Sequence, residues 1–393
     1  MPTVIREVDI SEPFEAIDAA SHYERCMLLF RWRGRRLGRA FVPLEDGHLS
    51  ARDVESHAQR TLGEQAVRAC VEEYLDYDGR VAPDAPLPSA TVAICTRERP
   101  SDLERALDAV AALAPAPIEI LVVDNAPETG ATRDVVRGRP GVRYVVEPNR
   151  GLNRARNRAL HEAAGDVVAF TDDDAVPEAA WLGALLANFG DPRVICVTGL
   201  TLPLELESSA QELFEEHCSF VRGFRRRVFD GLIDNPLAVG PIGAGANMAL
   251  RRGLGDAVGS FDSRLDAGTP TRSGGDHEMF ARMLLAGHRI VYDPLAVSWH
   301  RHRRSLPELR EVVRGYGTGV CAMWTGLLIE RRELGVLRLA WEWFRHDHLP
   351  LLRRPRRLFD AAGGDALRRH ELLGCLAGPW SWVASHRSGQ MRA

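Results

Sequence analysis

Residues 167–182, VVAFTDDDAVPEAAWL, place three consecutive aspartates directly after an apolar run. The run 167–170 is typical of a buried strand, so Asp172, Asp173 and Asp174 lie at its carboxyl end. At about 5 Å and an effective dielectric near ~20, each pair of like charges costs roughly 3 kcal/mol. A positive group must offset this cost, or one or more of the aspartates must point into water.

The segments around this motif alternate between predicted strands and predicted helices. Apolar, β-branched runs predict the strands, and apolar residues at helical spacing predict the helices. The alternation predicts an α/β fold with a mostly parallel sheet and helices on both faces. Ligands on such sheets bind at the carboxyl ends of the strands, where Thr96, Arg97 and Asp124 also lie. The predicted strands are 90–95, 118–124, 142–147 and 166–171, and the predicted helices are 101–113 and 151–165.

Four parts are expected along the chain. Residues 1–82 form a small α+β unit with a hairpin and one helix, in which no catalytic group is apparent. Residues 83–89 are a proline-rich linker, and residues 90–304 are the domain that carries the aspartates. Residues 305–393 interleave Leu, Val and Trp with Arg, which predicts a helical, arginine-rich C-terminal region.

The charge of the chain is unevenly distributed. The 393 residues carry a net charge of only −4, yet residues 301–393 hold 17 arginines against 9 acidic residues, so the remainder is acidic. A basic region of this kind suits an anionic membrane surface, an anionic substrate or an acidic partner. A solvated helical face that is balanced by the acidic body explains the charge equally well.

Several classes of protein are excluded by residues that the sequence lacks. All 50 basic residues are arginines, and both P-loop and Schiff-base enzymes need a lysine. The 7 cysteines are scattered without a C-x-x-C pair, which favours a reducing compartment and disfavours structural zinc. No secretory signal is visible, and the longest apolar-leaning stretch, residues 319–329, is too short to span a bilayer. A cytoplasmic protein is therefore expected.

The aspartate motif is compatible with only some kinds of ligand. No G-x-G-x-x-G follows the first strand, which disfavours a dinucleotide site. Phosphatases with an aspartate nucleophile usually continue with Gly-Thr and use a later lysine, whereas Asp174 is followed by Ala-Val. The remaining hypothesis is a divalent cation that is held by carboxylates and binds a nucleoside diphosphate. Asp172 and Asp174 are two residues apart, so both can face the same side of an extended segment.

The segment from Thr91 to about Arg303 resembles the family 2 glycosyltransferases, which have the nucleotide-sugar-binding GT-A fold. The resemblance rests on several motifs in the correct order over some 210 residues, and is much more specific than D-D-D alone. They are VAICTRERP (92–100), EILVVDNAP (119–127), NRGLNRARNRAL (149–160), FTDDDAVPEAAWL (170–182), GAGANMALRR (243–252), VGSFDSRL (258–265) and GGDHEMFARMLLAGHRIVYDPLAVSWHRHR (274–303).

The resemblance implies one-step transfer, with inversion, from a nucleoside diphosphate sugar, and UDP-sugars are the first expectation. A single base would deprotonate the acceptor hydroxyl. Asp276 is the expected base, and a position as helix N-cap is compatible with that role. Where the family usually has Glu-Asp, this chain has Gly275-Asp276, so Glu278 is an alternative base.

The resemblance also implies a divalent metal, Mn²⁺ or Mg²⁺. The expected ligands are Asp174, Asp172 and His300, with His302 as a rival to His300. Asp173 belongs to the motif, but its side chain is expected to point the other way. The alternative for Asp124 is a turn aspartate at the strand end. Arg154 and Arg158 compete with Arg156 for its role, and the glycines before Asn247 could equally make a tight turn. The residues expected at the nucleotide sugar are Thr96, Arg97, Asp124, Arg156, Asp172, Asp173 and Asn247.

The acceptor is not specified by the sequence. A glycan, a lipid-linked acceptor or a small natural product would each suit the resemblance, and no nucleic-acid partner is expected. The arginine-rich C-terminal region, which includes Trp341 and Trp343, suits peripheral docking at the inner face of a membrane. Packing against the catalytic domain or a second subunit is slightly favoured over docking. Two other functions are a glycosyltransferase-like scaffold without turnover and a nucleotidyltransferase.

Overall fold

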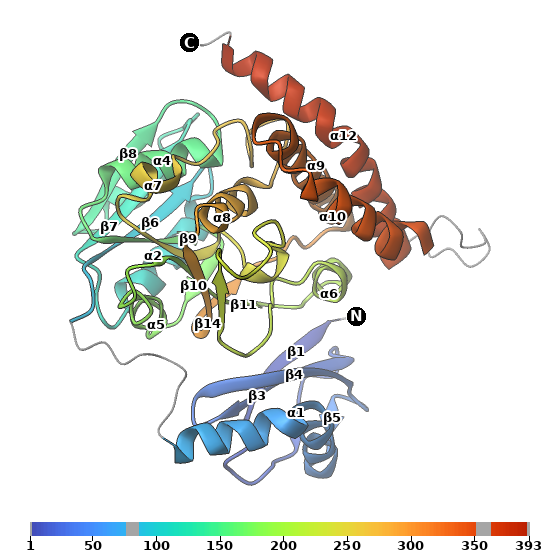
Figure 1. Ribbon diagram of the computed structural model, residues 1–393. Helices are drawn as coiled ribbons and strands as arrows, with labels where there is room; N and C mark the ends of the chain where they lie inside the picture. The colour runs from blue at the N-terminus through green and yellow to red at the C-terminus, as the bar shows by residue number, and fades with distance from the viewer. Residues whose placement is uncertain (1, 76–85, 351–362, 391–393) are drawn as a thin grey trace.

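The structure is a computed structural model that describes residues 2–75, 86–350 and 363–390. A central domain carries a large sheet, a small unit at the N-terminus lies beside it, and a group of helices at the C-terminus packs on another side (Figure 1). The boundaries expected at residues 82, 89 and 304 stay predictions, and residues 83–85 of the expected linker lie outside the described residues.

The N-terminal unit has its own sheet and its own core. Strands β1 (Thr3–Asp9), β3 (Arg25–Trp32) and β4 (Arg35–Pro43) form the sheet, with β1 parallel and β4 antiparallel to β3. The hairpin between β3 and β4 and the following helix α1 (Ala51–Tyr74) confirm the sequence prediction. Alternate apolar residues of β3 face this helix, whose backbone is kinked at Gly63. Two short strands, β2 (Ile17–Asp18) and β5 (His48–Leu49), form a separate pair.

The central sheet has the order β10-β14-β11-β13-β9-β6-β7-β8, and β12 pairs with β14. The half β9-β6-β7-β8 is parallel throughout, as the alternating sequence predicts. Its elements are β6 (Ala90–Thr96), α2 (Pro100–Ala111), β7 (Glu119–Asn125), α3 (Ala131–Arg137), β8 (Val142–Glu147), α4 (Leu152–Glu162) and β9 (Val167–Asp172). Helix α3 was not predicted from the sequence.

The second half of the sheet mixes directions. Strand β13 lies antiparallel to both of its neighbours, whereas β14 runs parallel to β11. Strand β14 is long and mostly buried, with Asp293 as a buried charged residue near its centre, and it ends on His300. The remaining elements are β10 (Ala175–Pro177), α5 (Trp181–Leu186), β11 (Val194–Pro203), α6 (Ser209–His217), β12 (Arg227–Asp230), η1 (Gly240–Ile242), β13 (Asn247–Arg251), α7 (Leu254–Val258), α8 (Gly275–Leu285) and β14 (Arg289–His300).

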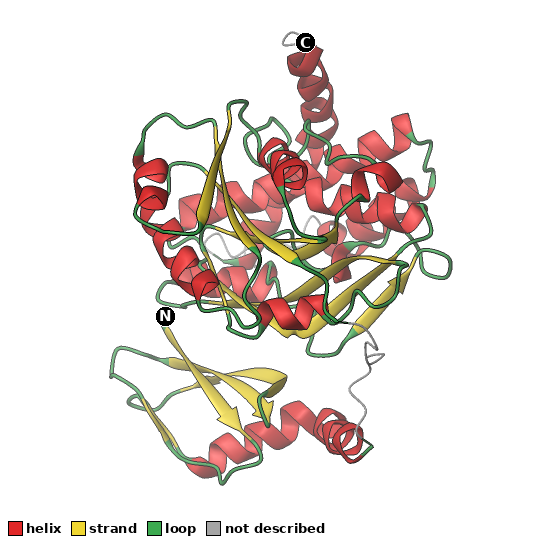
Figure 2. Cartoon of the chain, turned by 90° about the vertical axis from the view of Figure 1, so that its left-hand side faces the viewer, coloured by secondary structure: helices red, strands yellow, loops and turns green. Residues whose placement is uncertain are grey.

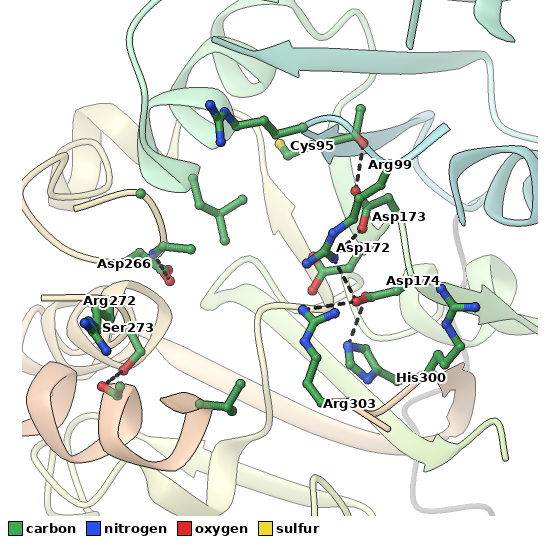
Figure 3. A pocket seen from close by; sticks show the side chains of 18 of the residues that line it. Cys95, Arg99, Asp172, Asp173, Asp174, Asp266, Arg272, Ser273, His300 and Arg303 are labelled. Atoms are coloured by element: carbon green, nitrogen blue, oxygen red, sulfur yellow. Dashed lines mark hydrogen bonds and ion pairs between the residues drawn. The ribbon is translucent and has the colours of Figure 1, made fainter. Parts of the chain in front are cut away.

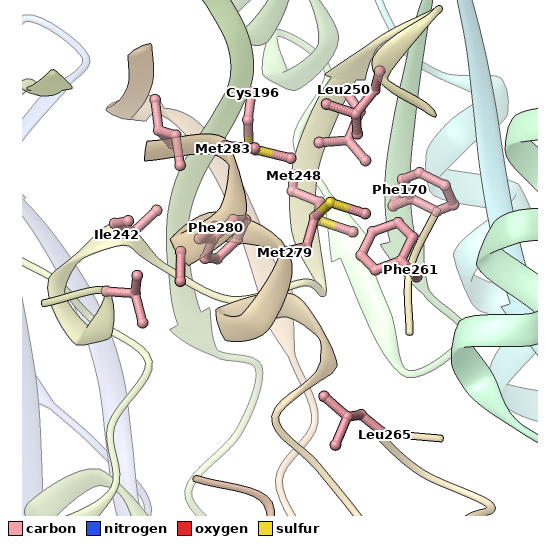
Figure 4. Close-up of a cluster of buried hydrophobic side chains, with 14 of the residues drawn as sticks. Phe170, Cys196, Ile242, Met248, Leu250, Phe261, Leu265, Met279, Phe280 and Met283 are labelled. Atoms are coloured by element: carbon pink, nitrogen blue, oxygen red, sulfur yellow. The ribbon is translucent and has the colours of Figure 1, made fainter. Parts of the chain in front are cut away.

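Helices cover both faces of this sheet, as Figure 2 shows. On one face, Phe170 and Met248 of the sheet pack against Met279 and Phe280 of α8, and Phe261 meets Phe170 edge to face (Figure 4). On the other face, Leu103 and Leu107 of α2 join the buried residues of β6 and β9. The two apolar layers fix the sheet, and they confirm the predicted α/β fold class with helices on both faces.

The C-terminal region is helical, as predicted. The amphipathic stretch expected after residue 304 is two helices, because the chain breaks at Arg331 and Arg332, the latter with a φ of 59°. Ser305 caps the first helix by accepting a hydrogen bond from the Glu308 N–H. Within the described ranges 2–75, 86–350 and 363–390, no helix is long and apolar enough to cross a bilayer. The elements are α9 (Leu306–Glu330), α10 (Gly335–Trp343), η2 (Phe344–His348) and α12 (Gly364–Gln390).

Candidate active site

A cavity of about 610 Å³ opens at the carboxyl ends of β6, β7 and β9. Two walls face each other across it, as Figure 3 shows. One wall carries the three aspartates, Arg99, His300 and Arg303, and we call it the acidic wall. The other carries Asp266, Arg272 and Ser273 from the loop before α8, with Tyr316 of α9, and we call it the helical wall. A sheet of this type is expected to bind its ligand at this edge.

Asp173 is held by the first strand of the sheet. Its two carboxylate oxygens accept hydrogen bonds from the Thr96 hydroxyl at 2.7 Å and from the Arg99 guanidinium at 3.1 Å. Burial raises the pKa of Asp173 to about 6, and the neighbouring charge of Asp174 adds to the shift. Thr96 and Arg99 thus hold Asp173 in place, and the side chain is not solvated.

Asp174 is the best-compensated of the three aspartates. It accepts a hydrogen bond from Arg99 at 2.9 Å, and His300 Nε2 and Arg303 lie 3.1 and 3.7 Å from its oxygens. Burial would raise the pKa of Asp174, but His300 and the two arginines outweigh it and hold the pKa far below its usual range. Arg99, Arg303 and His300 therefore supply the positive charge that the acidic motif requires.

Asp172, Asp174 and His300 form a group that can bind a metal ion. One potential ligand atom from each residue lies within 4.8 Å of the other two. Burial raises the pKa of Asp172, with repulsion from Asp174 as the next cause. Burial would lower the pKa of His300, but the two aspartates raise it above its usual value. Two carboxylates and one imidazole suit Mn²⁺, and a bound cation would take the place of the proton on His300.

The helical wall is fixed to α9 by polar contacts. The Ser273 hydroxyl donates a hydrogen bond to the Gly315 carbonyl at 2.9 Å, and Arg272 pairs with Glu311 at 2.7 Å. Gly315, Glu311 and Tyr316 all line the cavity themselves. The C-terminal region therefore contributes directly to the cavity.

A buried arginine, Arg156, holds Asp266 of the helical wall in place. Arg156 donates to Asp266 at 2.8 Å and to the Asn153 side chain at 3.2 Å, and its guanidinium lies 5.6 Å from the centre of the Phe261 ring. Burial raises the pKa of Asp266, whereas Arg156 works against the shift. Because Arg156 is 4% exposed and already paired, it is poorly placed to bind a nucleotide directly.

Asp276 lies near this arginine, at the start of α8. Its two oxygens accept hydrogen bonds from the backbone N–H groups of Gly245 and His277, each at 2.8 Å. Burial would raise the pKa of Asp276, but His277, Arg156 and the two backbone donors outweigh it, so the pKa is below its usual value. The alternative base, Glu278, is buried in a two-point ion pair with Arg282, at 2.7 and 2.8 Å.

The structure brings some of the predicted site residues together and separates others. Thr96, Arg97, Asp172, Asp173, Asp174 and His300 all line the cavity. Asn247 is buried instead, where its amide bonds the Leu200 and Ala296 carbonyls and accepts from the Trp181 indole. Asp124 is fully buried and accepts a hydrogen bond from the Tyr144 hydroxyl at 2.7 Å. The predicted residues outside the cavity lining are Asp124, Arg156, Asn247, Asp276 and Glu278.

Sequence reasoning missed several residues of the cavity. Arg97 was predicted and Arg99 was not, but Arg97 pairs with Glu128, while Arg99 reaches the aspartates. Asn125 was also missed. Its side chain bonds the Asn149 carbonyl and the Gly151 N–H, and so joins the end of β7 to the start of α4. The only available signal was the position of these residues in the same strand-end turns. The missed residues are Arg99, Asn125, Asp266, Arg272, Arg303 and Tyr316, whereas His302, the expected rival of His300, also lines the cavity.

Comparisons with known proteins agree with this geometry. Residues 91–255 match the family model for glycosyl transferase family 2. The pre-mycofactocin glycosyltransferase of Mycobacterium tuberculosis is 29% identical over 219 residues, which are 55% of this chain and 43% of that protein. The glucosyl-dolichyl phosphate glucuronosyltransferase of Haloferax volcanii is 25% identical over 231 residues, 54% of this chain and 68% of that protein. The chain thus spans less than half of its mycobacterial relative.

One solved structure shares the fold over most of the chain. It is the mannosyltransferase PcManGT from Pyrobaculum calidifontis, in complex with GDP-Man and Mn²⁺. The likeness has a TM-score of 0.51 at 17% identity, and covers 80% of this chain and 94% of that one. The central part of the chain thus has the GT-A fold, and residues 91–255 within it are similar to glycosyl transferase family 2.

Proposed function

We propose that this protein transfers a sugar, with inversion, from a nucleoside diphosphate sugar to an acceptor hydroxyl, and that it needs a divalent metal. The observation that carries the proposal is the group formed by Asp172, Asp174 and His300 at the edge of a cavity large enough for a nucleotide sugar. UDP-sugars are the first donors to test. GDP-mannose comes second, because PcManGT binds it on the same fold.

The side chains of the acidic wall have separate roles in this proposal. Asp174, Asp172 and His300 would hold Mn²⁺ or Mg²⁺, which would supply positive charge to stabilise a departing diphosphate. Arg99 and Arg303 lie beside Asp174, where their guanidinium groups can also contact phosphate oxygens. Asp173 positions Arg99 and does not bind the metal.

Asp276 is the proposed general base. Its lowered pKa keeps the carboxylate ionised at neutral pH, so that it can accept the proton of the acceptor hydroxyl. Glu278 is a weaker candidate because its two oxygens form a buried ion pair with Arg282, whereas those of Asp276 accept hydrogen bonds from uncharged backbone N–H groups. Asp266 lines the cavity and competes with Asp276 for this role, but its carboxylate is engaged by Arg156.

The acceptor site is proposed to lie along the helical wall. A lipid-linked acceptor is favoured, because the Haloferax volcanii relative is named for a dolichyl phosphate substrate. Docking at an anionic membrane surface would then use the C-terminal region, where the side chains of Trp341 and Trp380 are 58% and 77% exposed. A glycan or a small molecule as acceptor, and a homo-oligomer formed through the same helices, are the alternatives.

A turnover assay tests the proposal. The purified protein is incubated with UDP-glucose, UDP-glucuronate, UDP-galactose or GDP-mannose, with Mn²⁺ or with EDTA, and free nucleoside diphosphate and free sugar are quantified. Slow, metal-dependent hydrolysis of one donor is expected even without the acceptor. Pyrophosphate release from a nucleoside triphosphate and a sugar phosphate would identify a nucleotidyltransferase instead.

A second candidate function is a scaffold that binds nucleotide without turnover. Gly275 in place of the usual glutamate, together with the two backbone hydrogen bonds that occupy Asp276, favours it. Tight nucleotide binding with no hydrolysis of any donor, in the presence of Mn²⁺ and membrane lipids, would support the scaffold and contradict the transferase.

A further inference from the structure

The end of β14 that carries His300 rests on the N-terminal unit. Leu29 of β3 is fully buried against Val297 of β14 and Leu200 and Leu202 of β11. Arg36 of β4 lies with its guanidinium 5.6 Å from the centre of the Trp299 ring. Figure 1 shows this unit at the edge of the central domain, close to β14 and α6. Val297 and Trp299, which lie just before the candidate metal ligand, are thus packed against a different part of the chain.

A shared carboxylate strengthens this contact. The Trp299 indole N–H donates to Glu178 Oε1 at 2.8 Å, and Arg36 donates to Glu178 Oε2 at 3.0 Å. Arg36 also bonds Glu7 of β1, which belongs to the same unit. The backbone of β14 just before His300 is therefore fixed by a charged group from the N-terminal sheet.

A second, longer connection runs from the N-terminal unit to His300 itself. Arg39 of β4 pairs with Glu215 of α6, and the other oxygen of Glu215 lies 2.7 Å from His302 Nε2. The remaining ring nitrogen of His302, Nδ1, lies 3.4 Å from His300 Nδ1. His300 Nε2 in turn faces Asp174. The side chains of Glu215 and His302 are each only 1% exposed, so water hardly competes for these contacts.

The order of donors and acceptors along this connection is determined at its two ends. A metal ion at His300 Nε2 needs the lone pair of that nitrogen, so the proton must be on Nδ1. His300 Nδ1–H can then donate to His302 Nδ1, while His302 Nε2–H donates to the Glu215 carboxylate. Glu215 can keep its charge in this buried place because Arg39 neutralises it. A carboxylate that acts through histidine on a metal-binding imidazole is a common device for fixing ring orientation.

We propose that the N-terminal unit holds His300 in its metal-binding orientation, through Arg39, Glu215 and His302. This inference rests on the proposed role of His300 as a metal ligand. Arg39, Glu215 and His302 act as positioning residues. The N-terminal unit thus supports metal binding, although it contributes no ligand itself. The proposal gives a role to residues 1–82, in which the sequence shows no catalytic group.

The experiment compares Mn²⁺ affinity in matched variants of the full chain. Free Mn²⁺ is measured by electron paramagnetic resonance during titration of the wild type, Arg39→Ala, Arg39→Lys and Arg25→Ala. We expect Arg39→Ala to weaken Mn²⁺ binding about 10-fold, as loss of an outer-shell partner commonly does, and Arg39→Lys to recover part of it. Arg25→Ala is the control, because Arg25 pairs at 3.1 Å with Glu216, a more exposed residue of α6 than Glu215. This variant should bind Mn²⁺ like the wild type.

The outcomes distinguish failure of the positioning role from failure of the metal site itself. Equal Mn²⁺ affinity in wild type and Arg39→Ala would overturn the positioning role and leave the metal site intact. A wild type that binds no Mn²⁺, with or without UDP or GDP, would overturn the metal site and this inference together. If Arg39→Ala does not fold, as judged by circular dichroism, Glu215→Gln gives a second test, since Glu215 lies between Arg39 and His302 and does not line the cavity.

Discussion

The two walls of the cavity are held in place by different kinds of interaction. The acidic wall is supported from outside by the N-terminal unit, through buried charge pairs such as Arg39 with Glu215. The helical wall belongs partly to α9, which is supported by α12 through close contact of backbones. A β-carbon on Gly374 of α12 would lie 2.1 Å from the Arg314 carbonyl oxygen of α9. One on Gly317 of α9 would lie 2.2 Å from the Glu371 carbonyl oxygen of α12.

Because the two walls are held by different interactions, they should be disturbed by different substitutions. Removal of a single charge should disturb the acidic wall, because a buried carboxylate is left without its partner. The helical wall should tolerate loss of charge but not added volume, because the space between α9 and α12 is smaller than a methyl group at these positions. Metal affinity and acceptor use should therefore respond to different substitutions.

The largest effect is expected for Asp174→Asn in the acidic wall. The amide keeps the size of the side chain but removes the charge opposite His300 and Arg99. We expect donor turnover to fall on the order of 10²- to 10³-fold and Mn²⁺ binding to be lost. Initial rates at saturating donor and a direct Mn²⁺ titration would check this, and an unchanged Mn²⁺ affinity would contradict the metal assignment.

A second large effect is expected for Asp276→Asn, which lies in neither wall. We expect kcat to fall about 100-fold, as for loss of a general base, while Mn²⁺ and nucleotide affinity stay unchanged. Asp276 accepts hydrogen bonds from two backbone N–H groups, so the melting temperature should be recorded with the rates. A variant that keeps its kcat would move the role of base to Asp266.

The helical wall is tested by Gly374→Ala. The added methyl group would push α12 away from α9, at a cost of about 1–3 kcal/mol in stability. We expect a lower melting temperature and poorer acceptor use, with unchanged Mn²⁺ affinity. The matched control is Gly255→Ala in α7, where a β-carbon meets nothing within 4 Å. Loss of Mn²⁺ binding in Gly374→Ala would show that the two walls are not independent.

A smaller, pH-dependent effect is expected at Glu371 of α12. Burial, followed by repulsion from Asp347, raises the pKa of Glu371 to about 7. The folded state therefore holds the proton of Glu371 more tightly than the unfolded state, whose pKa is near 4.5. As a result, the stability of the folded state falls as the pH rises from about 4.5 to about 7. Glu371→Gln should therefore raise the melting temperature by about 1–3 °C at pH 8 and leave it unchanged near pH ~4. An equal gain at both pH values would contradict the shift.

The parallel half of the sheet could be predicted from the sequence, because its strands are short apolar runs separated by amphipathic helices. The aspartates at the end of β9 followed from the same pattern. Arg99 could not be distinguished from Arg97, because the direction of each side chain depends on the turn at Glu98, where φ is 55°. The burial of Asn247 could not be predicted because the glycines before it suggest a loop, whereas Asn247 begins a buried strand.

The connection behind the metal site could not be predicted from the sequence at all. Glu215 and His302 are 87 residues apart, and Arg39 comes from a unit with a separate core. Local patterns report which residues share a strand or a helix face, but they do not report which distant elements pack together. Side chains that act through tertiary contacts therefore become visible only in the folded structure.

A metal-dependent nucleotide-sugar site at the acidic wall is tested most directly by a thermal-shift experiment with UDP, GDP, dTDP and NADH, each with Mn²⁺ and with EDTA. A ligand that binds only the folded state raises the melting temperature by mass action. We predict a rise with one nucleoside diphosphate that requires Mn²⁺, is absent in Asp174→Asn, and does not occur with NADH. An equal rise in EDTA, or in Asp174→Asn, would contradict a metal-dependent nucleotide-sugar site at the acidic wall.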